Sequence, residues 1–225
     1  MPAATSTPAR KRILLVDDHP LLRQGIGQMV NAQPDLVVCG EAEDRAGALA
    51  EAERAQPDLA VIDLSLKNER GLELLKDLKA RFPGVLTLVL SMHDESLYAE
   101  RALRAGARGY VMKREASDKV LEAIRCVLGG GVFVSEKITG GILDKITGRQ
   151  ETVAGSPLAG LTDRELEVLV LIGQGYGVRQ IGQRLHISPK TVEAHRANLK
   201  LKLKLASGEE LLQHSIRWAR QLGEM

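Results

Sequence analysis

The stretch that decides the fold is Ile13-Leu14-Leu15-Val16-Asp17-Asp18, an apolar run that ends in two acidic residues. A second run, Leu59-Ala60-Val61-Ile62, ends in Asp63 in the same way. Short and wholly apolar runs are typical of strands that are buried on both faces of a parallel sheet. Since the carboxyl ends of such strands converge on one crevice, the sequence predicts that the three aspartates meet there.

Two later runs bring a hydroxyl and an ammonium to the same edge. Val85 to Leu90 precedes Ser91, and Tyr110-Val111-Met112 precedes Lys113. Adjacent carboxylates repel one another, and Mg²⁺, which prefers oxygen ligands, relieves that repulsion. The group therefore predicts a magnesium-assisted site at which Asp63 attacks a phosphoryl donor. The alternative, that these aspartates only cap turns, would explain Asp17-Asp18 but not all five positions.

Between residues 12 and 131, apolar runs alternate with helical periodicity. This alternation predicts an α/β doubly wound, five-stranded parallel sheet of the flavodoxin-like kind, with helices on both faces. The strand order 2-1-3-4-5 would place the ends of strands 1 and 3 side by side. Strands are predicted at 12–16, 35–39, 58–62, 85–90 and 108–112, and helices at 20–31, 43–54, 70–81, 95–105 and 116–128.

The last part of the chain is helical and basic. Thr162-x-x-Glu165 and Ser207-x-x-Glu210 have the spacing of capping boxes, and Ser188-Pro189 is a helix start. Between residues 176 and 206, seven Lys or Arg accompany one acid, Glu193. Two short helices, the second of them basic, predict a small all-α helix-turn-helix domain that contacts a polyanion. A solvated amphipathic hairpin is the alternative that charge alone leaves open.

Length and composition limit the remaining choices. The 225 residues suit a disordered lead at 1–11, a first domain at 12–131, a partly helical linker at 132–159 and a second domain at 160–225. No apolar run approaches the roughly 20 residues of a membrane span, and the start lacks the apolar middle of a signal peptide. Cys39 and Cys126 are far apart, which predicts reduced thiols in a cytoplasmic protein.

The first domain carries a set of motifs that belong together: Ile13 to His19, Val61-Ile62-Asp63, Gly71-Leu72-Glu73-Leu74, Ser91, and Ala105 to Tyr110 ahead of Lys113. On these motifs it resembles the receiver domain of a two-component response regulator. The resemblance implies that Asp63 accepts a phosphoryl group from a sensor histidine kinase and that Lys113 pairs with the product. It also implies that Mg²⁺ is held by Asp18, Asp63 and the backbone carbonyl of Ser65, with Asp17 acting through water.

The resemblance further implies a switch pair, Ser91 and Tyr110, in which the aromatic ring turns inward once the hydroxyl engages the phosphoryl group. Two departures from the usual pattern stand near the site. Leu66-Lys67 replaces the common Met-Pro, and Arg114 stands where a proline often follows the lysine. Neither departure removes a catalytic group.

Residues 160–218 carry Leu161-Thr162-x-Arg164-Glu165, Ile187-Ser188, Thr191-Val192-Glu193-x-His195-Arg196 and Lys202-Leu203-x-Leu205. With these motifs the segment resembles a LuxR-type DNA-binding domain, whose last helix forms a dimer seam. Gly182 stands where alanine is usual, which predicts a helix weaker by up to about 1 kcal/mol. The resemblance implies base contacts by Glu193, Ala194 and Ala197, and phosphate contacts by Lys190, Thr191, Arg196 and Lys200.

Together the two resemblances indicate a NarL/FixJ-type response regulator, not an enzyme, that binds double-stranded DNA as a homodimer. RNA polymerase is a further candidate partner, and no membrane partner is expected. Two other functions fit part of the sequence. A magnesium-dependent phosphohydrolase usually has a second aspartate where Ser65 stands, and it would leave the DNA-binding domain unexplained. A DNA-binding protein with a receiver that is only a scaffold would not need an intact Asp63 and Lys113.

Overall fold

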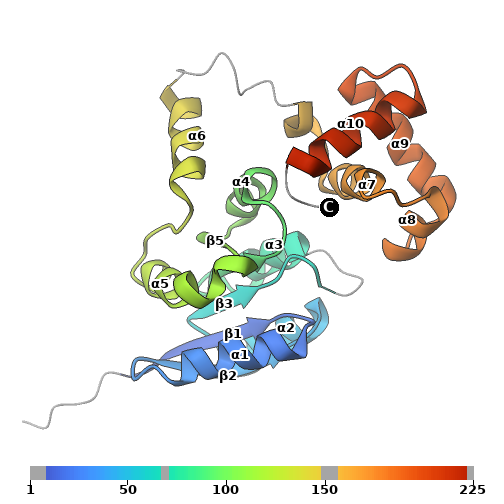
Figure 1. The fold of residues 1–225 in the computed structure, drawn as a ribbon. Helices are drawn as coiled ribbons and strands as arrows, with labels where there is room; N and C mark the ends of the chain where they lie inside the picture. The colour runs from blue at the N-terminus through green and yellow to red at the C-terminus, as the bar shows by residue number, and fades with distance from the viewer. Residues whose placement is uncertain (1–8, 67–70, 148–156, 222–225) are drawn as a thin grey trace, which may run out of the picture. The chain divides into compact units, whose positions relative to one another are not determined.

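The computed structural model describes residues 9–66, 71–147 and 157–221 (Figure 1). Residue contacts divide the chain into two units, Met1–Ile138 and Thr139–Met225. Each unit buries apolar side chains of its own. Within the described ranges, no helix is long and apolar enough to cross a membrane.

The first unit is built on a parallel sheet whose five strands follow the order β2-β1-β3-β4-β5. This order confirms the predicted doubly wound fold. Leu15 lies opposite Val61, and Val16 lies opposite Ile62. The register therefore brings the residues that follow β1 and β3 to the same level at the carboxyl edge. The strands are β1 Lys11–Val16, β2 Leu36–Ala42, β3 Leu59–Ile62, β4 Leu86–Ser91 and β5 Gly109–Met112.

Four helices connect the strands and a fifth follows β5, as the alternation predicts. A core of apolar side chains lies between one face of the sheet and α1 and α5, and includes Ile26 and Ile124. On the other face α3 packs beside α2 and α4. Aspartates begin two helices: the Asp44 and Asp94 carboxylates accept first-turn N–H groups. The helices are α1 Pro20–Asn31, α2 Arg45–Ala55, α3 Gly71–Arg81, α4 Glu95–Ala105 and α5 Ala116–Leu128, with a 3₁₀ turn, η1, at Lys113–Glu115.

The chain after α5 returns to the sheet. Phe133 forms a parallel bridge with Gly109 at the outer edge of β5. The Tyr110 N–H donates to the Phe133 carbonyl at 2.8 Å, and the Phe133 N–H donates to the Arg108 carbonyl at 3.0 Å. The helix α6, Glu136–Thr147, follows at once and continues past the boundary between the two units. The exposed edge of the sheet is thus covered by a segment of the same chain.

The second unit is helical, and its helix starts follow local capping chemistry. At α7 the Thr162 hydroxyl accepts from the Glu165 N–H and the Glu165 carboxylate accepts from the Thr162 N–H, so this capping box is present. Ser188 caps α9, with Pro189 in the first turn. The elements are η2 Pro157–Gly160, α7 Asp163–Gly173, α8 Val178–Arg184, α9 Pro189–Leu203 and α10 Gly208–Gln221.

Of the two hydrogen bonds predicted for the capping box at the start of α10, one is present and the other differs. The Ser207 hydroxyl accepts from the Glu210 N–H at 3.1 Å, as a capping box requires. The Glu210 carboxylate, however, accepts from the Ala206 N–H at 2.7 Å, one residue earlier than predicted. Lys204 ends α9 in the left-handed conformation, and the short turn that follows it brings the Ala206 N–H to the first turn of α10.

The turn between α8 and α9 lies close to Gly182. A Cβ at this position would be 2.8 Å from the Ile187 carbonyl oxygen. The Ile187 N–H donates to the Gly182 carbonyl at 2.9 Å. The sequence alone predicts only a weaker helix here, whereas the structure adds a close approach of backbone that favours glycine.

The helices α7 and α10 also meet at a glycine. A Cβ on Gly173 would lie 2.5 Å from the Ser215 carbonyl oxygen and 2.9 Å from the Ala219 Cβ. We expect Gly173→Ala to lower the free energy of unfolding of the helical unit by about 1–3 kcal/mol, because the helices must separate. Urea unfolding followed by the fluorescence of Trp218, the only tryptophan in the chain, measures this.

Gly140→Ala is the matched control, since a Cβ there meets nothing within 4 Å. It should be neutral or stabilising by up to about 1 kcal/mol. Equal urea midpoints for Gly173→Ala and the wild type would show that α7 and α10 can accommodate a methyl group at this crossing.

Candidate functional site

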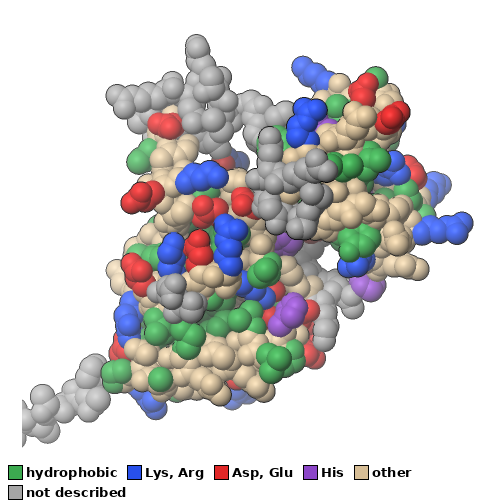
Figure 2. All heavy atoms as spheres, viewed as in Figure 1, with side chains coloured by type: hydrophobic (Ala, Val, Ile, Leu, Met, Phe, Trp, Pro, Cys, Tyr) green, Lys and Arg blue, Asp and Glu red, His purple; other side chains and the backbone are tan. Residues whose placement is uncertain are grey.

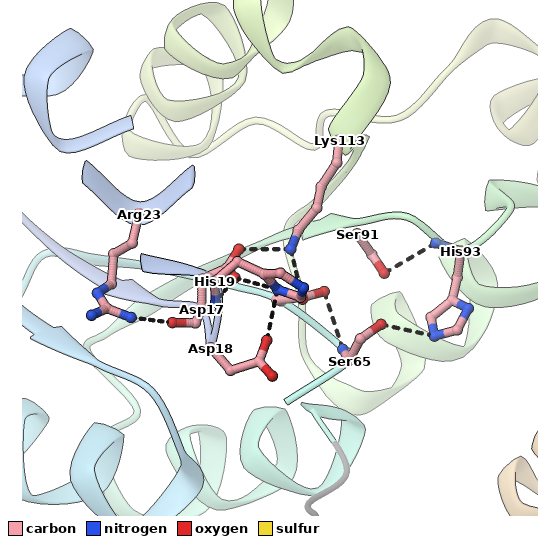
Figure 3. A network of polar contacts seen from close by, with 9 residues as sticks. Asp17, Asp18, His19, Arg23, Ser65, Ser91, His93 and Lys113 are labelled. Carbon is pink, nitrogen blue, oxygen red and sulfur yellow. Dashed lines mark hydrogen bonds and ion pairs between the residues drawn. The ribbon is translucent and has the colours of Figure 1, made fainter. Parts of the chain in front are cut away.

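The predicted polar residues gather at the carboxyl edge of the sheet (Figure 3). Asp17 and Asp18 follow β1, and Asp63 follows β3. Ser91 ends β4, and Lys113 follows β5. The side chains are held in the interior: Asp63 is 2% exposed and Ser91 is fully buried. Buried carboxylates need compensating partners, and the neighbouring side chains supply them.

Lys113 compensates two of the carboxylates. Its Nζ lies 2.7 Å from Asp17 Oδ2 and 2.7 Å from Asp63 Oδ2. Burial by itself would lower the pKa of Lys113, but the Asp63 and Asp17 carboxylates hold that pKa above its ordinary value of 10.5. Lys113 is therefore a protonated cation shared by the aspartates that follow β1 and β3.

Both oxygens of Asp63 are engaged. Oδ2 accepts from Lys113, and Oδ1 accepts from the Ser65 N–H at 3.1 Å. Gly71, the first residue of α3, has its Cα against the backbone here. A Cβ on it would lie 2.6 Å from the Asp63 carbonyl oxygen and 2.5 Å from the Leu64 Cα. The glycine thus lets α3 begin directly beside the acidic site.

The acidic group has the composition of a cation site. Asp17, Asp18, His19 and Asp63 each offer a ligand atom, and these atoms lie within 4.8 Å of one another. Asp18 Oδ1 is buried, and among the described residues no donor reaches it with hydrogen-bond geometry. Its 2.8 Å contact with His19 Nδ1 satisfies the distance of an ion pair but not the direction of a hydrogen bond. Carboxylates with an unsatisfied oxygen fit a hard divalent cation such as Mg²⁺.

The predicted switch pair has its aromatic ring turned inward. Tyr110 is 2% exposed, and its hydroxyl donates to the His93 carbonyl at 2.8 Å. The Ser91 hydroxyl accepts from the His93 N–H at 3.3 Å. The loop between β4 and α4 thus contacts both residues of the pair.

Two neighbours of the site, Arg23 and His93, are not predicted from the sequence. Arg23 donates to the Asp17 carbonyl at 2.5 Å and pairs with Glu41 at 2.9 Å. It is the fourth residue of α1, which begins two residues after Asp18. Its place in the first turn of that helix is a local signal for the contact. The His93 Nε2 lies 3.1 Å from the Ser65 hydroxyl, a contact between two loops for which the sequence carries no local signal.

A second candidate surface lies on α9. Val192, Leu199 and Leu203 are buried, whereas Glu193, Ala194 and Ala197 are exposed. Figure 2 shows Lys and Arg side chains among those on the surface of this unit. Arg196 lies 3.4 Å from Glu193, a long contact that leaves the carboxylate exposed. The predicted DNA contacts are all exposed or partly exposed: Lys190, Thr191, Glu193, Ala194, Arg196, Ala197 and Lys200.

The interior of the helical unit holds an ion pair that supports α9. Glu165 is 3% exposed and accepts from the Lys202 Nζ at 2.6 Å and from the Thr162 N–H at 2.8 Å. Burial by itself would raise the pKa of the Glu165 carboxyl, but Lys202 and Thr162 hold that pKa below the ordinary 4.5. The ion pair fastens the start of α7 to the end of α9.

This ion pair predicts a pH dependence. A carboxyl whose pKa is lower in the folded than in the unfolded chain stabilises the fold above its unfolded pKa, and that stability is lost as the pH falls through the folded pKa. We expect the urea midpoint of the helical unit to fall below pH 4.5. Glu165→Gln should be less stable than the wild type at neutral pH. Its urea midpoint should also change less with pH than that of the wild type. Parallel pH curves for the two proteins would contradict this role.

Comparison with known proteins identifies the family of each of the two units. Residues 13–125 match the response regulator receiver domain, and residues 159–215 match the bacterial regulatory proteins of the luxR family. The oxygen regulatory protein NreC of Staphylococcus carnosus is 34% identical over 210 residues, covering 92% of this chain and 97% of that protein. The transcriptional regulatory protein DegU of Brevibacillus brevis is 33% identical over 219 residues, covering 92% and 93%.

Solved structures of RcsB from Salmonella enterica serovar Typhimurium have the same architecture. One, bound to the promoter P1flhDC in the presence of the phosphomimetic BeF3⁻, is 25% identical with a TM-score of 0.64, and covers 92% of this chain and 98% of that one. Another contains two RcsB dimers bound to two parallel DNAs, with 26% identity, a TM-score of 0.55, and coverage of 91% and 97%. The chain belongs to the NarL/FixJ family of two-component response regulators, in which a receiver domain precedes a LuxR-type DNA-binding domain.

Proposed function

We propose that the protein accepts a phosphoryl group on Asp63 from a sensor histidine kinase and then regulates transcription by binding double-stranded DNA as a dimer. The observation that carries this proposal is the position of Asp63. It is a buried carboxylate beside Asp17 and Asp18, and Lys113 lies 2.7 Å from its Oδ2. The receiver would comprise residues 12–131, the linker 132–159 and the DNA-binding domain 160–225.

The chemistry follows from the side chains. An Asp63 oxygen attacks the phosphorus, the bond to the kinase histidine nitrogen breaks, and an acyl phosphate forms on Asp63. Lys113 pairs with the new anion, and the Ser91 hydroxyl can donate to it. When bound, Mg²⁺ neutralises charge on the transferring group. Asp18, Asp63 and the Ser65 carbonyl would hold this ion.

Asp17 would act on the ion through water. Both oxygens of Asp17 have protein partners, as do those of Asp63, whereas Asp18 keeps one oxygen without a hydrogen bond among the described residues. Asp17 Oδ1 accepts from the His19 N–H at 2.8 Å, and Asp17 Oδ2 lies 2.7 Å from the Lys113 Nζ. Asp18 offers a less occupied oxygen and is the better direct ligand.

On the DNA side, α9 would enter the major groove. Lys190, Thr191, Arg196 and Lys200 would lie near phosphates, while Glu193, Ala194 and Ala197 would face base edges, with α10 forming the dimer seam. The RcsB structures, one bound to a promoter and one with two dimers bound to two parallel DNAs, support DNA binding as a dimer by analogy. RNA polymerase is a further candidate partner. The protein would act as a regulator rather than an enzyme, because the phosphoryl group on Asp63 changes the state of the protein itself.

Mass spectrometry after incubation with acetyl phosphate and Mg²⁺ tests the proposal. A persistent adduct of one phosphoryl group is expected. Release of phosphate without an adduct would favour a phosphohydrolase, and neither adduct nor release would favour a DNA-binding protein with a receiver that is only a scaffold. Sedimentation with and without a beryllofluoride mimic tests dimerisation. Identical mass distributions at concentrations around the dimer constant would contradict a phosphorylation-dependent dimer.

A further inference from the structure

The segment that leads into α6 and includes its first turn, residues 132–138, contacts the rest of the receiver at two places. One is the β5 edge, where the Tyr110 N–H donates to the Phe133 carbonyl. The other is the first turn of α4, where the Ser135 hydroxyl donates to Glu95 Oε1 at 2.8 Å. We call residues 132–138 the linker clamp. Both attachments lie within the first unit.

The edge attachment is built into the sheet. A Cβ on Gly109 would lie 2.9 Å from the Phe133 carbonyl oxygen and 3.2 Å from the Phe133 Cβ. A glycine inside a strand marks a place where another backbone approaches closely. Gly109 therefore admits the clamp to a position that a side chain would occupy.

Both attachments involve Tyr110. In the attachment at the β5 edge, the Tyr110 backbone N–H is itself the donor. The second attachment starts at the Tyr110 hydroxyl, which donates to the His93 carbonyl at 2.8 Å. His93 lies two residues before Glu95, the first residue of α4. The inward ring of Tyr110 thus holds the loop that presents Glu95 to Ser135.

The last three residues of the clamp are the first three of α6. The Ser135 hydroxyl that donates to Glu95 also accepts from the Ile138 N–H at 3.3 Å, as a helix cap does. The start of α6 is consequently fixed by the same hydroxyl that contacts the receiver. Since α6 continues into the second unit, a change at Tyr110 can reach the DNA-binding domain along the covalent chain.

We propose that the contact between the linker clamp and α4 depends on the orientation of the Tyr110 ring. When the ring is inward, the Ser135–Glu95 hydrogen bond holds the start of α6 to the receiver. When the ring turns out, this hydrogen bond breaks. This inference rests on the proposed function, because it concerns how phosphorylation of Asp63 changes DNA binding. It assigns the transmitting role to Ser135 and Glu95, which lie outside the acidic site.

The test measures the Kd for promoter DNA with and without beryllofluoride and Mg²⁺, in the full-length protein. The ratio of the two Kd values is the coupling. Ser135→Ala should reduce this ratio about two- to tenfold, the range of one partly exposed hydrogen bond. Glu95→Ala should reduce it similarly, because it removes the oxygen that accepts from the Ser135 hydroxyl. Both variants should be phosphorylated by acetyl phosphate at the wild-type rate.

Lys137→Ala is the matched control, because Lys137 is an exposed residue of α6 outside the two attachments. Its coupling should equal that of the wild type. The double variant Ser135→Ala, Tyr110→Phe should lose no more coupling than the more affected of the two single variants. The reason is that both substitutions interrupt the same chain of contacts from Tyr110 to α6. Additive losses would show that Ser135 acts independently of Tyr110 and would overturn the proposal.

Hydrogen exchange supplies a second readout that does not depend on DNA. In the wild type, beryllofluoride should slow exchange in the peptide that covers the clamp, and Ser135→Ala should remove most of that protection. If Ser135→Ala has the same protection from exchange and the same ratio of Kd values as the wild type, the proposed role of the clamp is wrong, and the proposed function is unaffected. Failure of the wild type to take up a phosphoryl group would instead overturn the proposed function.

Discussion

Replacing Asp63 by asparagine will abolish phosphorylation and leave the receiver folded. The amide cannot act as the nucleophile that forms an acyl phosphate. The fold is retained because Lys113 keeps its contact with Asp17 at 2.7 Å, so the buried ammonium still has a charged partner. The side-chain oxygen of the introduced asparagine can also still accept from the Ser65 N–H. Mass spectrometry after treatment with acetyl phosphate and Mg²⁺ measures the loss, and circular dichroism checks the fold.

Asp58→Asn is the matched control for this experiment. Asp58 precedes β3, whereas Asp63 follows it, and the Asp58 carboxylate pairs with Lys11 at 2.9 Å. The same chemical change at that end of the strand should leave phosphorylation intact. If Asp63→Asn takes up a phosphoryl group with normal stoichiometry, the acceptor is another residue.

The second large effect is expected on the recognition helix. Glu193 is an exposed acid on a surface proposed to approach a polyanion, so it costs affinity unless it contributes specificity. A carboxylate in the major groove can accept from the cytosine amino group. We expect Glu193→Ala to reduce discrimination at one base pair by about 1–3 kcal/mol, with little change in non-specific binding. Selection from a library of randomised sites measures this discrimination.

Lys200→Ala is the contrasting variant. A lysine that contacts phosphate should weaken binding to all sequences alike and reduce the salt slope by about one unit. Both variants should therefore be compared at two salt concentrations. An unchanged sequence profile for Glu193→Ala would show that its carboxylate reads no base and serves only as the partner of Arg196, 3.4 Å away.

The sequence by itself determined the sheet and the gathering of the acidic residues. Each residue of the predicted site follows an apolar run, and in a parallel sheet the carboxyl ends of all strands lie at one edge. The start of α7 was predictable for a similar reason. A capping box depends on residues three apart, so Thr162 and Glu165 must meet whenever the helix forms.

Tertiary structure alone decided which atoms of distant residues are in contact. Lys113 bridges Asp17 and Asp63, Lys202 reaches the buried Glu165, and Phe133 returns to the edge of β5. Periodicity reports which face of an element is buried, but not which atom of a distant element it will touch. Those contacts depend on strand register, on helix crossings such as the one at Gly173, and on where loops return. These features are set by packing of the whole unit rather than by any local stretch of sequence.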